Sequence, residues 1–178
     1  YGLIGPNGSG KSTLFDLLSG HLFADKGDIH IHGSDIRACP RRQLARKLTS
    51  VPQSFSLNFD YSVEEVVLMG RYPYIPRFAN PQKEDFLAAE EAMHSLDIYH
   101  LRSRKVTQLS GGEKQRVMIA RALAQDTDII LLDEVTSNLD INHAVSIMKV
   151  MHNMVARHEK TVLAALHDLN IASAFCDE

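Results

Sequence analysis

A glycine-rich loop near the start of the chain has the residue types and the spacing that hold a phosphate group. Residues 5–12 read GPNGSGKS and match the pattern GxxxxGK[ST] at every fixed position. Glycines permit a tight turn that aims several backbone N–H groups at phosphate oxygens, and the following helix adds the partial positive charge of its N-terminus. We therefore expect a nucleotide to be bound by Gly5, Pro6, Asn7, Gly8, Ser9, Gly10, Lys11, Ser12 and Thr13.

Three side chains of this loop have separate expected roles. Lys11 should reach the β- and γ-phosphates, Ser12 should bind Mg²⁺, and Thr13 should lie near the α-phosphate. The alternative is an ordinary glycine turn. The apolar strand expected before the loop and the helix expected after it favour the phosphate-binding function.

Two adjacent carboxylates follow a continuous apolar run at residues 129–132. Ligands of open α/β sheets bind beyond the carboxyl ends of the strands, so both side chains should face the nucleotide. Asp133 is then placed to hold Mg²⁺ through water, and Glu134 is the candidate general base for the attacking water. The alternative is a pair of solvated carboxylates at a strand end.

Histidines occur at two places where they could act. His167 directly follows the apolar run 161–166 and could contact the γ-phosphate and orient the water, although a histidine at a strand end often has a structural role. His30 and His32 alternate along one strand and could bind a metal. Because no third ligand accompanies them, we favour a solvated strand face.

A second glycine-rich helix start lies in the middle of the chain, within the sequence LSGGEKQR at residues 109–116. Ser110 is a candidate N-cap, and Gly111 and Gly112 leave the first N–H groups of the helix uncovered, so this helix start is also suited to phosphate. Taken alone, Ser-Gly-Gly is a common turn. Gln53 carries no signal of its own.

Strands and helices alternate along the chain. Strands are expected at 1–4, 28–32, 48–52, 129–132 and 161–166, with a turn at 33–35. Helices are expected at 11–19, 41–46 and 144–156. The pattern from 62 to 125 is also helical, with the proline-bearing segment 73–81 separating two of its helices. This order predicts an α/β fold with a mainly parallel sheet and a helical insertion between residues 53 and 128.

Composition narrows the class of protein. The chain has 178 residues, which suits one domain, and its formal net charge of −3 gives no general indication of nucleic-acid binding. Cys39 and Cys176 are far apart and lack metal-ligand spacing, which fits structural thiols in a reducing compartment. No apolar run approaches the length needed to span a bilayer. Because the ends fall inside a strand and a helical pattern, we expect a fragment truncated at both ends.

In combination these motifs resemble the nucleotide-binding subunits of ATP-binding-cassette (ABC) transporters. The glycine loop, Gln53, the signature segment at residues 109–113 (LSGGE), the run 129–134 and His167 occur in that family's order. The resemblance implies a P-loop NTPase core with an inserted α-helical subdomain that carries the signature. Within one ABC ATPase domain, 1–178, residues 1–60 and 126–178 would form a RecA-like core and about 61–125 the helical subdomain.

The resemblance also implies roles that the residues alone do not. Gln53 would sense the γ-phosphate and Mg²⁺ as part of the catalytic machinery, and Asp140, in the segment 137–140, would lie at a subunit interface. Two subunits would pair head to tail as a homodimer. Ser110, Gly111, Gly112 and Glu113 of one subunit would then contact ATP held by the other. The implied reaction is hydrolysis of ATP to ADP and phosphate, with ATP and Mg²⁺ as ligands.

Residues 70–74 (GRYPY) and 167–170 (HDLN) are similar to those of iron–siderophore, haem and cobalamin importers. For residues 71–74, the alternative is a packed helix end and turn. The implied partners are a transmembrane permease and, indirectly, a solute-binding protein. The implied location is peripheral, on the cytoplasmic face of the inner membrane, and no nucleic acid is implied.

The chain departs from the family's pattern at two positions. Val135 stands where the family usually has proline, so the turn loses a fixed φ. Tyr1 is too close to the glycine loop to stack on adenine, so the adenine platform is expected outside this chain.

Three alternatives remain beside an ATPase for import of an iron chelate. One is the ATPase of another ABC importer or of an exporter. Residues 71–74 disfavour the exporter. Another is a soluble ABC ATPase of DNA repair or chromosome structure. That class carries long coiled coils between the glycine loop and the signature, whereas this chain has no sustained heptads there. The last is a non-catalytic cassette, which Lys11, Asp133, Glu134 and His167 disfavour.

Overall fold

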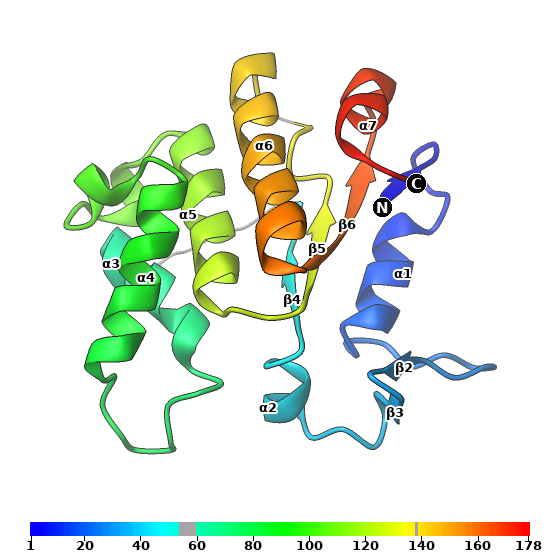
Figure 1. The fold of residues 1–178 in the computed structure, drawn as a ribbon, viewed down its shortest axis with the longest axis horizontal. Helices are drawn as coiled ribbons and strands as arrows, with labels where there is room; N and C mark the ends of the chain where they lie inside the picture. The colour runs from blue at the N-terminus through cyan, green and yellow to red at the C-terminus, as the bar shows by residue number, and fades with distance from the viewer. Residues whose placement is uncertain (54–59, 138) are drawn as a thin grey trace.

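A four-stranded sheet forms the centre of the molecule (Figure 1). The computed structural model describes residues 1–53, 60–137 and 139–178. The strands β1 (Gly2–Ile4), β4 (Leu48–Val51), β5 (Ile129–Asp133) and β6 (Thr161–Leu166) lie in the order β1-β6-β5-β4. Every neighbouring pair is parallel, so the expected parallel sheet is confirmed.

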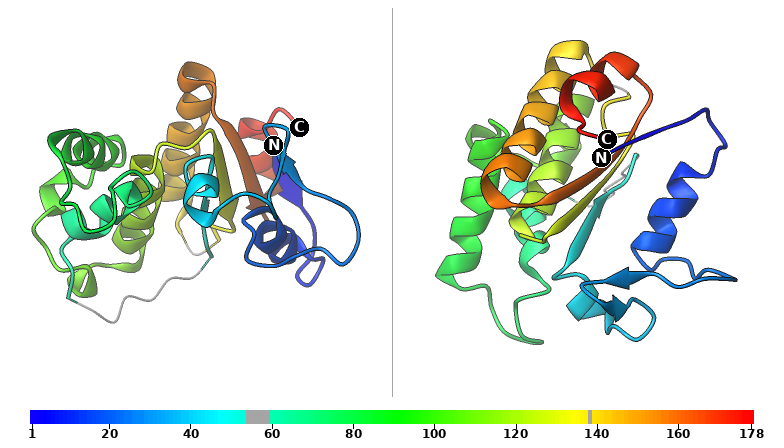
Figure 2. Two further views of the ribbon diagram at one scale, coloured as in Figure 1. Left: turned by 90° about the horizontal axis from the view of Figure 1, so that it is seen from below. Right: turned by 45° about the vertical axis from the view of Figure 1, so that its right-hand side comes forward.

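Helices cover both faces of this sheet, as an apolar parallel sheet requires. The helices α6 (Ile141–His158) and α7 (Leu169–Phe175) lie on one face and α1 (Lys11–Leu18) on the other (Figure 2). Strand β5 contributes side chains to the apolar cores on both faces of the sheet. Ile130 and Leu132 belong to the larger core, and Leu131 belongs to the smaller core around Phe15. This two-sided burial explains why the run 129–132 is continuously apolar.

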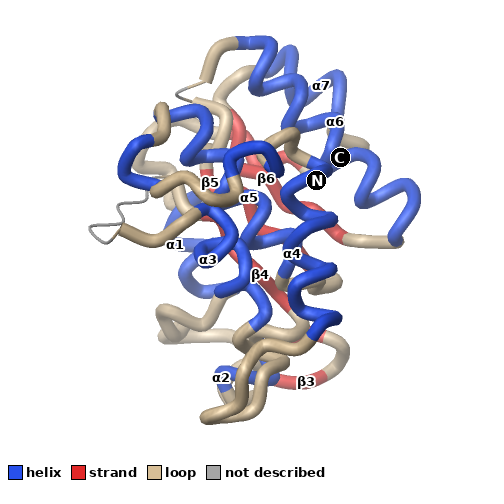
Figure 3. The backbone as a smooth tube through the Cα atoms, turned by 90° about the vertical axis from the view of Figure 1, so that its left-hand side faces the viewer, coloured by secondary structure: helices blue, strands red, loops and turns tan. Residues whose placement is uncertain are grey.

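A group of helices packs beside the β4 edge of the sheet (Figure 3). It comprises α3 (Val63–Leu68), α4 (Lys83–Ser95), α5 (Gly111–Ala124) and the 3₁₀ turns Met69–Arg71, Tyr99–Leu101 and Val106–Gln108. Their apolar faces form one core with the α6 side of the sheet. In the parts of the chain that the structure describes, no helix is both long and apolar enough to cross a membrane.

The expected strand at 28–32 is wrong in its extent. Only His30–Ile31 forms a strand, β2, and it pairs antiparallel with β3 (Ser34–Asp35), where a turn was expected. The reason is local, because His32 adopts a left-handed φ of 49° and ends the extended segment. His32 and Gly33 therefore make the turn of a short hairpin.

Several helix boundaries also differ from expectation by one to three residues. The basic helix α2 covers Arg41–Leu44 and stops short of residue 46. Helix α6 begins at Ile141, three residues early, because the Asp140 side chain accepts a hydrogen bond from the His143 N–H and caps the helix. The two chain ends lie side by side, with the Gly2 N–H donating to the Glu178 carbonyl at 2.7 Å (Figure 2).

Candidate nucleotide-binding site

The glycine loop connects β1 to α1, which is the context that the motif requires. Gly8 and Gly10 have φ values of 80° and 92°, a left-handed conformation that costs a residue with a side chain much more than glycine. Gly10 is also the N-cap of α1, so the turn delivers the chain directly onto a helix N-terminus. Within the turn the Ser9 N–H donates to the Pro6 carbonyl at 3.2 Å, and the N-terminus of α1 presents further N–H groups to an anion.

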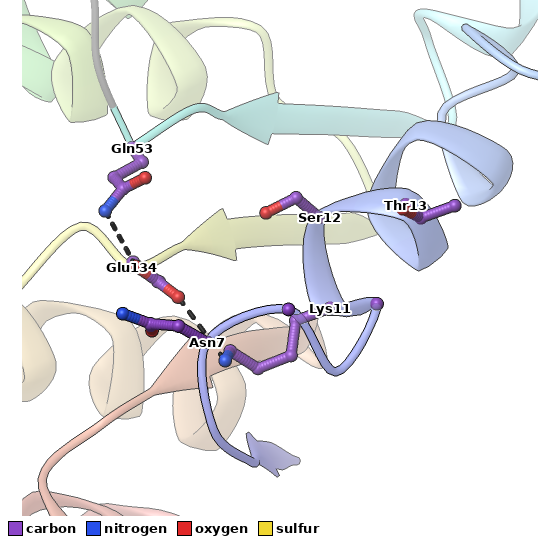
Figure 4. A pocket seen from close by; sticks show the side chains of 8 residues that line it. Asn7, Lys11, Ser12, Thr13, Gln53 and Glu134 are labelled. Carbon is purple, nitrogen blue, oxygen red and sulfur yellow. Dashed lines mark hydrogen bonds and ion pairs between the residues drawn. The ribbon is translucent and has the colours of Figure 1, made fainter.

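A cavity of about 340 Å³, the P-loop cavity, lies over this loop (Figure 4). It is lined by Asn7, Gly8, Gly10, Lys11, Ser12, Thr13, Gln53 and Glu134. Gln53 comes from the segment after β4 and Glu134 from the end of β5, so three parallel elements contribute to one site. The structure therefore brings the glycine loop, Gln53 and Glu134 to one cavity.

The Lys11 side chain reaches across the glycine loop and is held there by backbone carbonyl groups of the loop. Its Nζ donates to the carbonyl oxygens of Gly5 at 2.8 Å and of Pro6 at 3.1 Å. The same ammonium group lies 3.5 Å from Glu134 Oε1, and both side chains are almost fully buried. A buried cation at the mouth of an N–H-lined turn is suited to a polyphosphate.

Glu134 is the point at which the candidate catalytic side chains meet. Gln53 Nε2 donates to Glu134 Oε2 at 2.7 Å, and His167 Nε2 lies 2.6 Å from Glu134 Oε1. Glu134 itself has a φ of 51°, and its backbone N–H donates to the Ala165 carbonyl of β6. The left-handed backbone of Glu134 is a strained conformation, and its carboxylate lies beside Lys11. The sequence did not reveal this conformation.

Asp133 is the last residue of β5 and has an unusual environment. Among the described residues, its buried Oδ1 has no hydrogen-bond partner. Burial raises the pKa of this carboxyl above its ordinary value, the Glu134 and Asp16 charges add to the rise, and the Ser12 hydroxyl and Lys11 act in the opposite direction. Mg²⁺ prefers hard oxygen ligands, so an unsatisfied carboxylate oxygen near a hydroxyl fits a magnesium site.

We expect Asp133→Asn to stabilise the ligand-free protein. Because the folded state raises the pKa of Asp133, the folded state disfavours its charged form, and this cost is absent below the ordinary carboxyl pKa and present above the raised one. The melting temperature of the variant should therefore exceed that of the wild type at pH 7. The difference should shrink as the pH falls from 7 and should be lost below about 4, the ordinary pKa of a carboxyl group. Calorimetry at both pH values checks this, and a lower melting temperature at pH 7 would contradict it.

The signature segment begins α5 with a reciprocal cap. Ser110 Oγ accepts from the Glu113 N–H at 3.3 Å, and Glu113 Oε2 accepts from the Ser110 N–H at 2.8 Å. The hydrogen bonds from Ser110 lower the pKa of Glu113. The expected N-cap is thus confirmed, and the cap leaves the N–H groups of Gly111 and Gly112 for another acceptor.

The signature segment lies apart from the P-loop cavity. Ser110, Gly112 and Glu113 line a second cavity of about 460 Å³, together with Asp140 and His143. Among the described residues, these two cavities have no lining residue in common. The two glycine-rich helix starts therefore line two separate cavities of the chain.

Asp140 has a contact that sequence reasoning missed. Besides capping α6, its carboxylate pairs with His143 Nδ1, and these hydrogen bonds lower the pKa of Asp140. An aspartate three residues before a histidine at a helix start is the signal that could have found this pair. The neighbouring Asn138 lies outside the described residues.

The two histidines of the hairpin lie at the protein surface. His30 and His32 are exposed, and His32 Nε2 lies 3.2 Å from Asp128 Oδ2. Among the residues that the structure describes, no group of three histidine, cysteine or acidic side chains could hold a metal ion. Cys39 and Cys176 are free thiols.

A parallel sheet, a strand–glycine loop–helix unit and a carboxylate at the end of a neighbouring strand define the P-loop NTPase fold. The profile of the ABC transporter family matches residues 1–137. The chain therefore belongs to the ABC transporter family, in its ATP-binding part.

Relatives in the family are similar over nearly the whole chain. The cobalamin import ATP-binding protein BtuD of Halobacterium salinarum is 40 % identical over 99 % of this chain, and the petrobactin import ATP-binding protein YclP of Bacillus subtilis is 38 % identical over 98 %. The chain spans 44 % of the length of the first relative and 68 % of the second.

Solved structures agree with this assignment. A putative metal-chelate type ABC transporter in an inward-facing conformation superposes with a TM-score of 0.85 at 37 % identity, over 98 % of this chain and 65 % of that one. The dimeric ABC transporter cassette MJ0796 gives 0.84 at 31 % identity, over 97 % and 76 %.

Proposed function

We propose that the protein binds ATP with Mg²⁺ and hydrolyses it to ADP and phosphate. The observation that carries this proposal is the convergence of Lys11, Gln53 and His167 on the Glu134 carboxylate beside the P-loop cavity. A carboxylate so placed can accept a proton from a water molecule that is in line with a γ-phosphate. The groups that hold it can also bind the phosphate.

Each residue of the site has its own role in phosphoryl transfer, a reaction in which positioning and charge stabilisation dominate catalysis. Lys11 and the loop N–H groups bind the β- and γ-phosphates and offset the charge that develops on them. Ser12 and Asp133 are the candidate Mg²⁺ ligands, with Gln53 beside them, and the ion when bound neutralises phosphate charge. Glu134 takes the proton of the attacking water, and His167 and Gln53 orient that carboxylate and the water.

The second part of the proposal is a head-to-tail homodimer. The signature segment does not reach the P-loop cavity of its own chain, so Ser110, Gly111, Gly112 and Glu113 serve the nucleotide of a partner subunit. Asp140 lines the same cavity as the signature and belongs to the same interface. The dimeric structure of MJ0796, a cassette of the same family, supports pairing of this kind.

The third part concerns the role of the whole protein. We assign it to the cytoplasmic face of a membrane, where ATP hydrolysis drives uptake of an iron-siderophore-like chelate through a permease supplied by a solute-binding protein. The names of the cobalamin and petrobactin import relatives and the metal-chelate type structure support this class of substrate. Residues 61–125 act in it as a helical subdomain beside a core of 1–60 and 126–178.

Deleting the gene in its source organism should abolish uptake of one iron chelate while other nutrients enter normally. Radiolabelled iron supplied as a siderophore, as haem and as a simple salt, with labelled cobalamin in parallel, identifies the ligand. The wild-type gene should restore uptake and a Lys11→Ala gene should not, because the phosphate-binding cation is lost. Normal uptake of all these compounds in the deletion strain would contradict the proposal, and accumulation of a compound inside the cells would indicate an exporter.

A further inference from the structure

The C-terminal end of α5, the helix that begins with the signature segment, is tied to the sheet by Gln125. Its Oε1 accepts a hydrogen bond from the Thr49 hydroxyl of β4 at 2.9 Å. Its Nε2 donates to the carbonyl oxygens of Ala45 at 2.6 Å and of Leu48 at 3.2 Å. Gln125 is the C-cap of α5, so one amide joins the helix end to β4 and to the segment after α2.

A second set of contacts fixes the same helix end. The Tyr74 hydroxyl donates to the Asp126 carbonyl at 3.2 Å, and the Tyr74 ring lies under the guanidinium groups of Arg71 at 4.2 Å and Arg46 at 5.1 Å. Arg71 also donates to the Ala124 carbonyl at 2.8 Å. The importer-like residues 70–74 thus pack between the end of α5 and the region of α2.

Close packing leaves little freedom at this junction. A Cβ added to Gly70 would overlap the carbonyl oxygen of Arg121 in the last turn of α5. Arg46 Nε donates to the Pro73 carbonyl at 2.8 Å, as does Arg42 Nε. The base of α5 is therefore held from two sides, by Gln125 on the sheet and by Tyr74 on the helical side.

We propose that Thr49 and Gln125 are positioning residues that set the direction of α5 and so place the signature segment for the partner subunit's nucleotide. This inference rests on the proposed head-to-tail dimer. Helix α5 has 14 residues and a length of about 21 Å. A tilt of about 5° at its fixed end displaces the other end by about 2 Å, and errors of about 1 Å at a reacting site can cost about 10²-fold.

The Thr49 contact is also connected, through β4, to the half of the site that contains the P-loop cavity. Thr49 is in β4, which pairs with β5 and leads towards Gln53 and the P-loop cavity. The hydrogen bond from Thr49 to Gln125 therefore joins the strand that delivers Gln53 to the helix that delivers Ser110. Removing this hydrogen bond should change the position of α5 relative to β4, while the P-loop itself stays intact.

The chain offers a matched control for this test. Thr49 and Thr127 are both buried, with 4 % and 2 % of their surfaces exposed. The Thr127 hydroxyl donates to the Ile129 carbonyl two residues away, so it makes a local contact and does not join α5 to β4. Replacing either threonine by valine removes a buried hydroxyl and keeps the shape of the side chain.

The experiment uses the full-length protein carrying Glu134→Gln, with Thr49→Val, Thr49→Ser or Thr127→Val added. The measured quantities are ATP-dependent dimerisation by analytical ultracentrifugation, ADP affinity by calorimetry and melting temperature. We expect Thr49→Val to weaken dimerisation at least about tenfold, given the cost of misplacement. Its ADP affinity should match that of the Glu134→Gln parent. Thr49→Ser and Thr127→Val should dimerise within about twofold of the parent.

Each other outcome overturns the inference. If Thr49→Val and Thr127→Val lower the melting temperature equally and dimerise like the parent, the Thr49–Gln125 bond has only a structural role. If Thr49→Val weakens ADP binding as much as dimerisation, its effect is on the fold as a whole. If the Glu134→Gln parent does not dimerise with ATP, the proposed dimer fails first, and this assignment fails with it.

Discussion

Replacing Glu134 by glutamine in the full-length protein lowers the rate of ATP hydrolysis by about 10²-fold or more and leaves ATP binding intact. The amide has almost the shape of the carboxylate but cannot accept a proton from water, and a positioned general base contributes about 10²–10⁴-fold. Lys11, 3.5 Å from the carboxylate, loses a negative neighbour, so the phosphates of ATP meet less competition for this cation. Dimers should therefore accumulate with ATP bound.

Two measurements check this result: steady-state release of phosphate, and the fraction of dimer in the presence of ATP and Mg²⁺. Glu159→Gln is a matched control, since Glu159 also has a left-handed φ, 53° against 51° for Glu134, and is exposed at the end of α6. It removes the same charge from a similar backbone conformation away from the P-loop cavity. Turnover at the wild-type rate in Glu134→Gln would refute the general-base assignment.

The sequence allowed a good prediction of the sheet and the glycine loop because both depend on local signals. The fixed pattern at residues 5–12 dictates a turn in which Gly8 and Gly10 adopt the left-handed conformation that glycine favours. The run 129–132 is apolar throughout because both faces of β5 are covered. The strand at 28–32 was wrong because alternation of side chains does not reveal a left-handed residue such as His32.

The identities of the site residues could be predicted from the sequence more easily than the contacts between their side chains. Gln53, Glu134 and His167 lie far apart along the chain, and only the order of parallel strands brings their side chains within hydrogen-bond distance. The left-handed backbone of Glu134 has no sequence signal, since a glutamate rarely adopts it. Long-range packing also decides the surroundings of Gln125, which reads in the sequence as an ordinary helix end.

The separate positions of the two glycine-rich helix starts can be tested with dimers that combine two different mutant subunits. We expect Lys11→Ala subunits and Ser110→Arg subunits to be nearly inactive as homodimers, because every composite site contains one lesion. In a heterodimer of the two, head-to-tail pairing places both lesions on one nucleotide and leaves the other site intact. Purified heterodimers should therefore bind ATP at one site with normal affinity.

The reciprocal combination sharpens the test. A subunit carrying both Lys11→Ala and Ser110→Arg, paired with a wild-type subunit, places one lesion in each composite site, so both sites should be impaired. If each subunit instead completed its own site, the results would exchange: the double mutant paired with wild type would keep one good site, and the mixed single mutants would keep none. Tandem tags with calorimetric titration of ATP separate these patterns. We expect the first pattern because, among the described residues, the P-loop cavity and the cavity beside the signature segment share no lining residue, so the two helix starts of one subunit line separate cavities.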